Sequence, residues 1–264
     1  MIKLGEDLLD DPADWGRLLI ETHDHDPLYT GLLCWDKPGA RKRRFLLAYW
    51  CCYSVGASWY ISQQSGSRFW DLLYKAAENI EPSPLGERWP RAHERRHWRA
   101  LNATSCVSDL RARYKYPEEA VWELEQCKTL GEVTKAATRW TQFGPWIAFK
   151  AADMIERVLA APIEFTNTLI DLYADPRKGA EMAGAIWECS PEEAVNNLLR
   201  SLGDLVPPGG GRQVGIQEVE TVLCKWKSAR GGRYYIGADT HDHRAELARW
   251  GAQDLLSAYP TTPA

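Results

Sequence analysis

The residues best suited to bind phosphate form a short turn between two helical patterns, Phe143-Gly144-Pro145-Trp146. Glycine can adopt the positive φ of a sharp turn, and proline favours the first turn of a helix while removing an amide that would be unpaired there. The amides from Trp146 onward then lie at the positive end of a helix dipole. The turn therefore predicts an anion site, with an ordinary helical corner as the alternative.

The six histidines fall in three close pairs: His23 with His25, His93 with His97, and His241 with His243. His93 and His97 have the spacing of a helical metal motif, and a glutamate follows the first of them. Two arginines also stand between them and would repel a dication, so phosphate contact by the segment RAHERRHWR is favoured. A metal held jointly by the other two pairs is the alternative. We expect no metal ion and no cofactor.

Charge is distributed unevenly along the 264 residues, although the net charge is only −4. Residues 1–34 hold two Lys or Arg against eight Asp or Glu, whereas residues 35–100 hold twelve against six. The acidic balance of the whole chain argues against indiscriminate coating of nucleic acid. The local basic excess suggests an anionic partner, with a solvated basic face as the alternative.

Thirteen Trp and eleven Tyr predict a Trp-rich core, or rings that stack on a ligand or on bases. Seven Cys without a CxxC motif predict reduced, buried thiols in a cytosolic protein. Residues 1–34 are acidic, unlike a signal peptide. The apolar stretch 45–61 is short and contains Ser and Gly, which favours a buried helix over a membrane span.

The elements that must position these residues read mostly as helices, so we expect a mainly α fold. The expected helices include a hydrophobic one at 44–62, a long basic one at 91–114, and others at 146–160, 162–174 and 177–188. The segment 231–239 could form one short strand. The Gly- and Pro-rich segment 205–215 reads as a lobe boundary or a flap.

Two segments together resemble the helix-hairpin-helix DNA glycosylases over residues 40–175. Gln63, Gln64 and Ser65 match a segment that enters the duplex near the target base in that family. Phe143 and Gly144, with the alanines at 148, 151 and 152, match the hairpin and helix that grip one strand. The resemblance implies a two-lobed helical fold with a core at 1–175, its hairpin near 142–146, and a C-terminal helical lobe at 176–264.

The sequence departs from those glycosylases at the residues that carry their chemistry. Phe165 stands where the catalytic Asp is expected, and Glu164 is one position away. Trp146 and Ile147 occupy the region of the bifunctional members' Lys, and no four-Cys iron–sulfur pattern is present. Cleavage of a glycosidic bond needs a carboxylate beside the developing positive charge, so this activity is in doubt.

The wider pattern resembles the bacteriophage amino acid:DNA transferases, on the segments QQSGSRFW, FGPWIAFKAADM and CKWKSARGGRYYIGAD. That resemblance implies replacement of the pyrophosphate on 5-(pyrophosphoryloxymethyl)uracil in DNA by the amine of an amino acid or a polyamine. The implied partners are double-stranded DNA containing the modified uracil and a small amine such as glycine, glutamate or putrescine. The implied location is the host bacterial cytoplasm during infection.

This reaction requires a base presented outside the stack, cations for the departing pyrophosphate, and an acceptor for the proton of the amine. The candidates for DNA contact are Gln63, Gln64, Ser65, Phe143, Gly144, Pro145 and Trp146. The candidates for pyrophosphate binding are Arg41, Arg43, Arg44, Lys225, Lys227 and Arg230. The candidate proton acceptors are Asp153, Glu164, Asp239 and His241.

Each candidate also has a purely structural interpretation. Asp153 reads by default as an exposed helical residue, Lys225 and Lys227 as a solvated face, and Gln63 and Gln64 as a helix end. Two alternative functions remain open, a true DNA glycosylase and a non-catalytic DNA-binding helical protein. The missing catalytic Asp separates the transferase from the glycosylase, whereas only product analysis separates the transferase from the binding protein.

Overall fold

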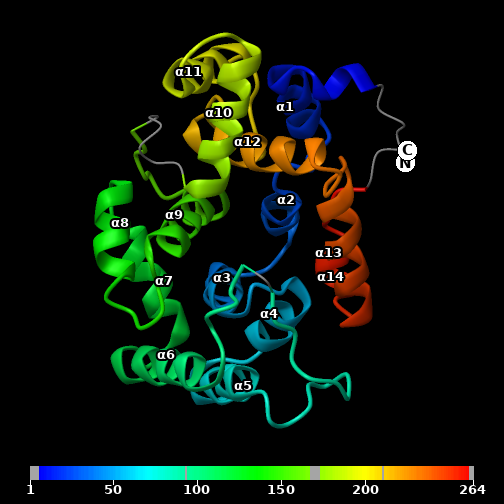
Figure 1. Ribbon diagram of the computed structural model, residues 1–264. Coiled ribbons are helices and arrows are strands. Elements are labelled where there is room, and N and C mark those ends of the chain that lie inside the picture. The colour runs from blue at the N-terminus through cyan, green and yellow to red at the C-terminus, as the bar shows by residue number, and fades with distance from the viewer. Residues whose placement is uncertain (1–5, 93, 167–172, 210, 262–264) are drawn as a thin grey trace. The chain divides into compact units, whose positions relative to one another are not determined.

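The computed structural model describes residues 6–92, 94–166, 173–209 and 211–261, and these are mainly helical (Figure 1). Among them the only β pairing is a single bridge between Thr129 and Glu164. The predicted mainly α class is therefore confirmed. By backbone contacts the chain divides into two compact units. Unit 1 comprises residues 1–33, 165–242 and 259–264, and unit 2 comprises 34–164 and 243–258.

Unit 1 is built from a 3₁₀ turn and helices from both ends of the chain. They are η1 (Glu6–Leu9), α1 (Pro12–Glu21), α2 (Pro27–Cys34), α10 (Ala174–Ile186), α11 (Pro191–Ser201) and α12 (Ile216–Arg230). Local sequence sets their starts: Asp11 accepts from the amide of Ala13 at 2.7 Å, and Ser190 forms a capping box with Glu193. Helix α12 packs on α1 and α10 over a core that contains Trp15 and Trp226.

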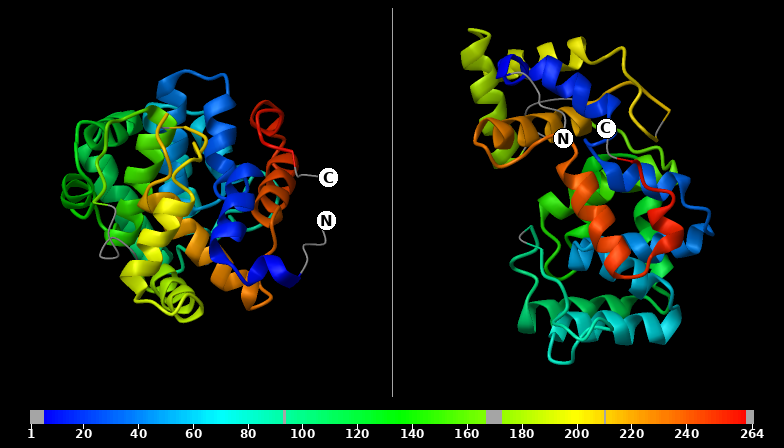
Figure 2. Two further views of the ribbon diagram at one scale, coloured as in Figure 1. Left: turned by 90° about the horizontal axis from the view of Figure 1, so that it is seen from above. Right: turned by 90° about the vertical axis from the view of Figure 1, so that its right-hand side faces the viewer.

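Unit 2 contains seven consecutive helices and a short C-terminal one. They are α3 (Gly39–Cys52), α4 (Val55–Ser62), α5 (Gly66–Glu78), α6 (Ala100–Arg113), α7 (Pro117–Glu125), α8 (Leu130–Ala137), α9 (Pro145–Leu159) and α14 (Gln253–Leu256). Helix α13 (Ala238–Arg249) begins in unit 1 and ends in unit 2. Helices α5 and α6 lie side by side, as the right-hand view of Figure 2 shows. Helix α9 packs on α3, α7 and α8.

The expected hydrophobic helix at 44–62 is in fact two helices. Tyr53 ends α3 with a left-handed φ of 52°, and the Ser54 hydroxyl accepts from the amide of Ala57 at 3.2 Å to begin α4. Many of their side chains are buried, in agreement with the expected core role. No helix among the described residues is long and apolar enough to cross a membrane.

Three other expected elements differ from the structure. The basic helix expected at 91–114 is helical only as α6, because residues 94–97 form turns and residues 98–99 are irregular. The helix expected at 162–174 is absent at residues 162–166, which are irregular apart from the bridge at Glu164; residues 167–172 lie outside the described chain, and Ala174 begins α10. Segment 231–239 forms turns and the start of α13 rather than a strand.

The division into units differs from the consecutive lobes expected at 1–175 and 176–264. Residues 1–33 belong with the later helices because α1 packs against α12 and α11. The Gly- and Pro-rich segment is irregular where it is described, at 205–209 and 211–215, and it lies within unit 1. Sequence adjacency therefore does not define the units.

The thiols are free, and Cys51, Cys52 and Cys106 are buried, as predicted; Cys34 is exposed and the remaining three are partly buried, so the prediction of buried thiols is wrong for Cys34. Burial raises the pKa of Cys52 to about 12, which keeps this thiol protonated. Within the described ranges, no cluster of three or more His, Cys, Asp or Glu is placed to hold a metal. The spacing argument about His93 and His97 involves His93, which lies outside the described residues.

Candidate functional site

The turn between α8 and α9 begins a helix where the sequence predicted one. Pro145 is the first residue of α9, and Gly144 is its N-cap with extended backbone and no side-chain cap. The expectation that Gly144 adopts a positive φ is wrong, since its φ is −91°. The left-handed residue is Gln142, with a φ of 67°. The next residue, Phe143, is buried.

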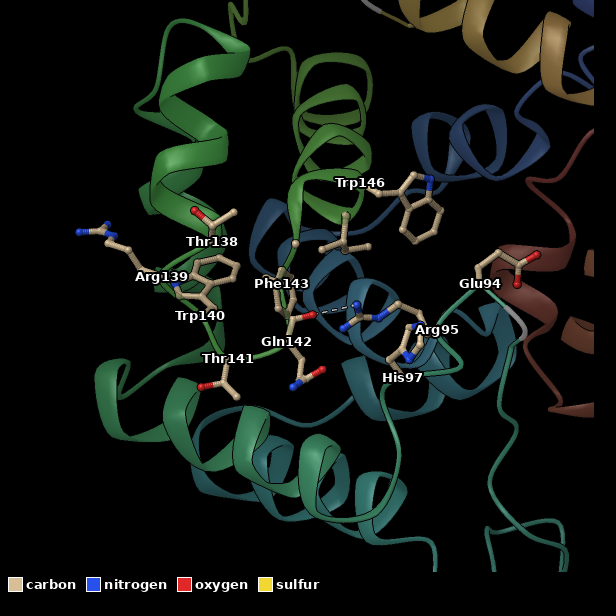
Figure 3. A pocket seen from close by; sticks show the side chains of 12 residues that line it. Glu94, Arg95, His97, Thr138, Arg139, Trp140, Thr141, Gln142, Phe143 and Trp146 are labelled. Atoms are coloured by element: carbon tan, nitrogen blue, oxygen red, sulfur yellow. Dashed lines mark hydrogen bonds between the residues drawn. The ribbon is translucent and has the colours of Figure 1, made fainter. Parts of the chain in front are cut away.

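This turn forms one wall of a cavity of about 640 Å³ in unit 2 (Figure 3). The opposite wall comes from Glu94, Arg95 and His97, which belong to the segment RAHERRHWR. The described lining consists of Glu94, Arg95, His97, Thr138, Arg139, Trp140, Thr141, Gln142, Phe143, Gly144, Trp146 and Ile147. The structure thus brings together two segments that sequence analysis had proposed separately as phosphate contacts.

Arg95 ties the two walls together. Its Nη1 donates to the Gln142 carbonyl oxygen at 3.0 Å, and its Nε donates to the Cys51 carbonyl oxygen at 3.4 Å. The guanidinium carbon lies 5.2 Å from the centre of the Phe143 ring. A cation over an aromatic face is attracted by the ring quadrupole. Arg95 therefore fixes the turn while keeping its charge at the cavity wall.

On its other side, the turn is held by hydrogen bonds from Thr141 to Asp109 of α6 and from Trp140 to Tyr114, the residue after α6. The Thr141 amide and hydroxyl donate to Asp109 Oδ2 at 3.0 and 3.2 Å. Burial opposes ionisation of Asp109, but hydrogen bonds from Thr141 and Arg113 outweigh it, so the pKa of this carboxyl lies below its ordinary value. The Trp140 indole donates to the Tyr114 hydroxyl at 3.0 Å.

The Gln63-Gln64-Ser65 segment links α4 to α5 in the same unit. Gln63 is the exposed C-cap of α4, Gln64 is half-buried, and Ser65 is the exposed N-cap of α5. The next residues of α5 line a second cavity, of about 360 Å³, together with Tyr114. Because Tyr114 is bonded to Trp140, the walls of the two cavities are in direct contact. The turn thus lines one cavity, whereas the Gln63–Ser65 segment directly precedes residues that line the other.

The three arginines expected on α3 are all engaged by carboxylates. Arg43 forms a bidentate pair with Glu125 at 2.8 and 2.7 Å, and Arg44 bonds Glu118 at 2.5 Å. Arg41 lies 3.5 Å from Asp254, and its guanidinium carbon lies 4.7 Å from the centre of the Trp35 ring. Burial lowers the pKa of Arg41, although Asp254 opposes that shift. Pyrophosphate would have to compete with these partners, so this role stays a prediction.

The basic residues of α12 are likewise held within unit 1. Lys225 donates to the carbonyl oxygens of Asp24 and His25 and lies 2.7 Å from Asp239. Two further contacts complete the set: Lys227 pairs with Asp175, and Arg230 donates to the Leu9 carbonyl oxygen at 3.0 Å. The structure thus joins one predicted cation, Lys225, to one predicted proton acceptor, Asp239. The alternative that Lys225 and Lys227 form a solvated face is wrong, because both side chains are largely buried and paired.

The buried Asp24 carboxylate, which sequence analysis did not single out, organises the segment that carries Asp239. It accepts from the Tyr234 hydroxyl, the Gly237 amide at 2.7 Å, and the Thr240 amide and hydroxyl at 3.0 and 2.7 Å. Burial, then the nearby Asp239 and Asp24 carboxylates, raise the pKa of Tyr234 far above its ordinary value, so its hydroxyl stays a donor. In the sequence, Asp24 stands between His23 and His25 in the acidic segment THDHD, whose pattern suggested a metal site and not a buried carboxylate.

The four candidate proton acceptors lie in different settings. Asp153 is fully buried on α9, which corrects the default view of an exposed helical residue. Glu164 is exposed in unit 2, and its backbone pairs with Lys128 and Leu130. In unit 1, Asp239 has a side chain 39% exposed, and His241 is exposed on α13. Asp239 lies beside another candidate, the ammonium of Lys225.

Helix α9 also buries two charged residues that sequence analysis missed, Glu156 and Arg157. Together with Asp153 they lie at spacings of three and four, so one helical face carries all three. Burying charged groups is expensive unless they are paired, and functional sites are where proteins accept such expense. The helical spacing of these three charged residues can be read from the sequence, but their burial is seen only in the structure.

Comparison with known proteins decides the family. A sequence model described as amino acid:DNA transferase matches residues 20–235. The chain is 39% identical to a protein named glycinyltransferase from Pseudomonas phage PaMx11, over 94% of this chain and 95% of that one. It is 27% identical to a protein named putrescinyltransferase from Delftia phage PhiW-14, over 93% of this chain and 81% of that one.

This chain belongs to the amino acid:DNA transferase family. The resemblance seen in the sequence is confirmed, and the chain is a transferase rather than a glycosylase or a non-catalytic binding protein.

The family match covers candidate residues in each of the two units. It includes the turn at 142–147, Arg95, Asp153 and Glu164, and in unit 1 it includes Asp24 and Lys225. It ends at Tyr235, before Asp239 and His241. The transferase therefore carries its cavity and its buried α9 charges within the matched region, whereas two of the four candidate acceptors lie beyond it.

Proposed function

We propose that the chain transfers glycine to DNA, displacing pyrophosphate from 5-(pyrophosphoryloxymethyl)uracil. The observation that carries this proposal is the 39% identity to a relative named glycinyltransferase, which extends over both units. The relative named putrescinyltransferase is less similar, at 27%, which favours an amino acid over a polyamine. The DNA partner is double-stranded and contains the modified uracil.

The covalent step exchanges one substituent and leaves the sugar bond intact. The glycine nitrogen forms a bond to the methylene carbon on C5 of the uracil. The bond from that carbon to the pyrophosphate oxygen breaks, and pyrophosphate leaves with the electron pair. Before this attack, the glycine ammonium loses a proton to a carboxylate or an imidazole, which makes its nitrogen a neutral nucleophile. No oxidant or reductant is needed, and no carboxylate is required at the glycosidic carbon.

The helical scaffold supports presentation of the base outside the duplex. We extend the proposal to a helix-hairpin-helix, glycosylase-like two-lobed fold, in which the turn at 142–146 contacts one strand and Gln63, Gln64 and Ser65 approach the target base. The exposed N-cap Gly144 supports this role, because a Cβ there would meet nothing within 4 Å and the backbone is open to approach. Base extrusion is the general solution for enzymes that modify a base in a duplex.

The residues that handle protons and pyrophosphate are proposed from the same candidate sets. Asp153, Glu164, Asp239 and His241 are the candidate acceptors, since glycine must lose a proton to become a neutral nucleophile. Arg41, Arg43, Arg44, Lys225, Lys227 and Arg230 remain candidate cations, each with a partner that anion binding would displace. The proposed location is the host bacterial cytoplasm during infection, where DNA and free amino acids are both present.

The experiment is incubation of the protein with DNA containing 5-(pyrophosphoryloxymethyl)uracil and, separately, glycine, glutamate or putrescine. Nucleosides are then released enzymatically and identified by mass spectrometry. We expect the glycine adduct of thymidine to form fastest. An adduct with putrescine alone would refute the choice of amine, and no adduct with any amine would refute the reaction. Single variants Asp153→Asn, Glu164→Gln, Asp239→Asn and His241→Gln then identify the acceptor from the pH dependence of the rate.

A further inference from the structure

The cavity beside the turn has the size and the walls of a nucleotide site. Its volume of about 640 Å³ lies within the range of about 300 to 1,000 Å³ typical of small-molecule pockets. Figure 3 shows Arg95 and Trp146 on the same side of the turn, with Gln142 bonded to Arg95. Polar and aromatic groups thus face one space, which is the composition a phosphorylated base requires.

Arg95 is a cation whose bonding capacity the described protein does not fill. Its two hydrogen bonds go to carbonyl oxygens, and its Nη2 is buried without a partner among the described residues. Its situation differs from that of Arg43, which is neutralised by Glu125 through two bonds. Arg139, also on the cavity wall, is paired with Glu123. Arg95 is therefore the lining arginine for which no carboxylate partner is found in the described chain.

The start of α9 adds positive potential to the same space. The helix is 15 residues long, and its N-cap Gly144 supplies no side-chain acceptor for the first amides. The Trp146 and Ile147 residues that carry those amides line the cavity. Unpaired amides at a helix N-terminus favour anions. His97 is a further polar group on this wall, and Glu94 is the one carboxylate among the described lining residues.

Trp146 provides a face on which a base could stack. Its ring is half-buried and rests on Tyr53, with ring centres 5.5 Å apart, and Tyr53 in turn stacks on Tyr49 at 4.6 Å. This support holds the indole in place while leaving part of it uncovered. Stacking on an aromatic ring is worth about 1 to 3 kcal/mol per base.

We propose that this cavity binds the pyrophosphate-bearing pyrimidine of DNA, with the diphosphate at Arg95 and the α9 amides and the pyrimidine against Trp146. The inference rests on the proposed function and deepens it by assigning the leaving group to Arg95, rather than to the arginines of α3. A diphosphate carries several charges, and a fork-shaped guanidinium next to a helix N-terminus is suited to its oxygens.

Inorganic pyrophosphate is the direct probe, because its binding needs neither DNA nor turnover. Titration calorimetry of the full chain should show binding, and Arg95→Gln should weaken it at least about tenfold, as loss of a charge-assisted bond implies. Arg95→Lys, which keeps the charge without the fork, should fall between. Arg96→Gln is the matched control, since Arg96 is exposed and does not line the cavity. Thermal unfolding of each variant checks that the turn remains folded.

A second readout reports on the opposite wall. Pyrophosphate should change the tryptophan emission of the wild-type protein, and Trp146→Phe should abolish most of that change while binding persists. Equal pyrophosphate binding by the wild type and Arg95→Gln would overturn the proposal, as would an absence of binding by the wild type. Failure to form the glycine adduct would instead refute the proposed function and leave these binding results unaffected.

The source of the phosphate is settled with two DNA duplexes. One contains 5-(pyrophosphoryloxymethyl)uracil and the other thymine at the same position. If Arg95 binds the leaving group, Arg95→Gln weakens binding of the modified duplex by a larger factor than that of the thymine duplex. Equal factors would show that Arg95 contacts the DNA backbone instead, and would overturn the assignment.

Discussion

The carboxylate of Asp24 accepts a hydrogen bond from the hydroxyl of Tyr234, which lies 210 residues later in the chain. Two more residues of the same segment, Gly237 and Thr240, also donate hydrogen bonds to this carboxylate. The family match begins at residue 20 and ends at residue 235, so both Asp24 and Tyr234 lie within it. The contact joins the N-terminal part of unit 1 to the segment that carries Asp239, and Asp239 lies beside Lys225.

Replacement of Asp24 by Asn should therefore destabilise the protein. The amide has one accepting oxygen, and its NH₂ would face groups that are themselves donors. A buried network left unsatisfied in this way loses about 2 to 4 kcal/mol, measurable by urea unfolding. Asp242→Asn is the control, since Asp242 is exposed in the same unit and should change stability little. Equal stability of the two variants would show that the network contributes nothing.

Gln142 should tolerate glycine better than a β-branched residue. Its φ of 67° lies in the left-handed region, where a side chain adds strain and glycine does not. Gln142→Gly should leave the melting temperature unchanged or higher, whereas Gln142→Val should lower stability by about 1 to 2 kcal/mol. Calorimetric melting of both variants checks this. A stable valine variant would mean that the turn relaxes to another conformation.

Asp109 should contribute stability that is lost in acid. Its folded-state pKa lies below the ordinary value of 3.8, because hydrogen bonds from Thr141 and Arg113 outweigh the opposing effect of burial. A depressed pKa stabilises the folded state above the unfolded pKa, and this contribution disappears as pH falls through the folded pKa. Unfolding free energies measured between about pH 6 and pH 2 should show the wild type and Asp109→Asn converging at the acid end. A constant difference would contradict the assignment.

Arg43 and Glu125 allow the structural role of the α3 arginines to be separated from pyrophosphate binding. If the pair is structural, Arg43→Gln and Glu125→Gln each destabilise the protein. The double variant should then be more stable than the sum of the two losses predicts, with a coupling of about 1 kcal/mol or more. Glycine transfer per folded molecule should be unchanged in all three. A selective loss of transfer in Arg43→Gln would return pyrophosphate binding to this arginine.

Features set by neighbouring residues could be predicted from the sequence. Pro145 at the start of α9 was predicted because proline geometry acts within one helical turn. The phosphate-binding interpretation of the turn and of RAHERRHWR also came from local patterns, and the structure places Arg95 and the turn on one cavity.

Features set by distant residues could not be predicted. Arg43 meets Glu125 across 82 positions, so a basic run that read as an anion site is engaged by glutamates. Gln142 rather than Gly144 adopts the left-handed conformation, beside the buried Phe143, and local residue preferences favoured the glycine. Asp153 is buried because α9 packs on three other helices. Periodicity alone gave no sign of this.

The proposed reaction exchanges one substituent on the DNA base. The most direct measurement is the amount of pyrophosphate released and of glycine adduct formed in a single reaction with DNA containing 5-(pyrophosphoryloxymethyl)uracil. We expect equal amounts of pyrophosphate and glycine adduct, with every modified base still attached to its sugar. Pyrophosphate release without a glycine adduct, or the appearance of abasic sites, would contradict it.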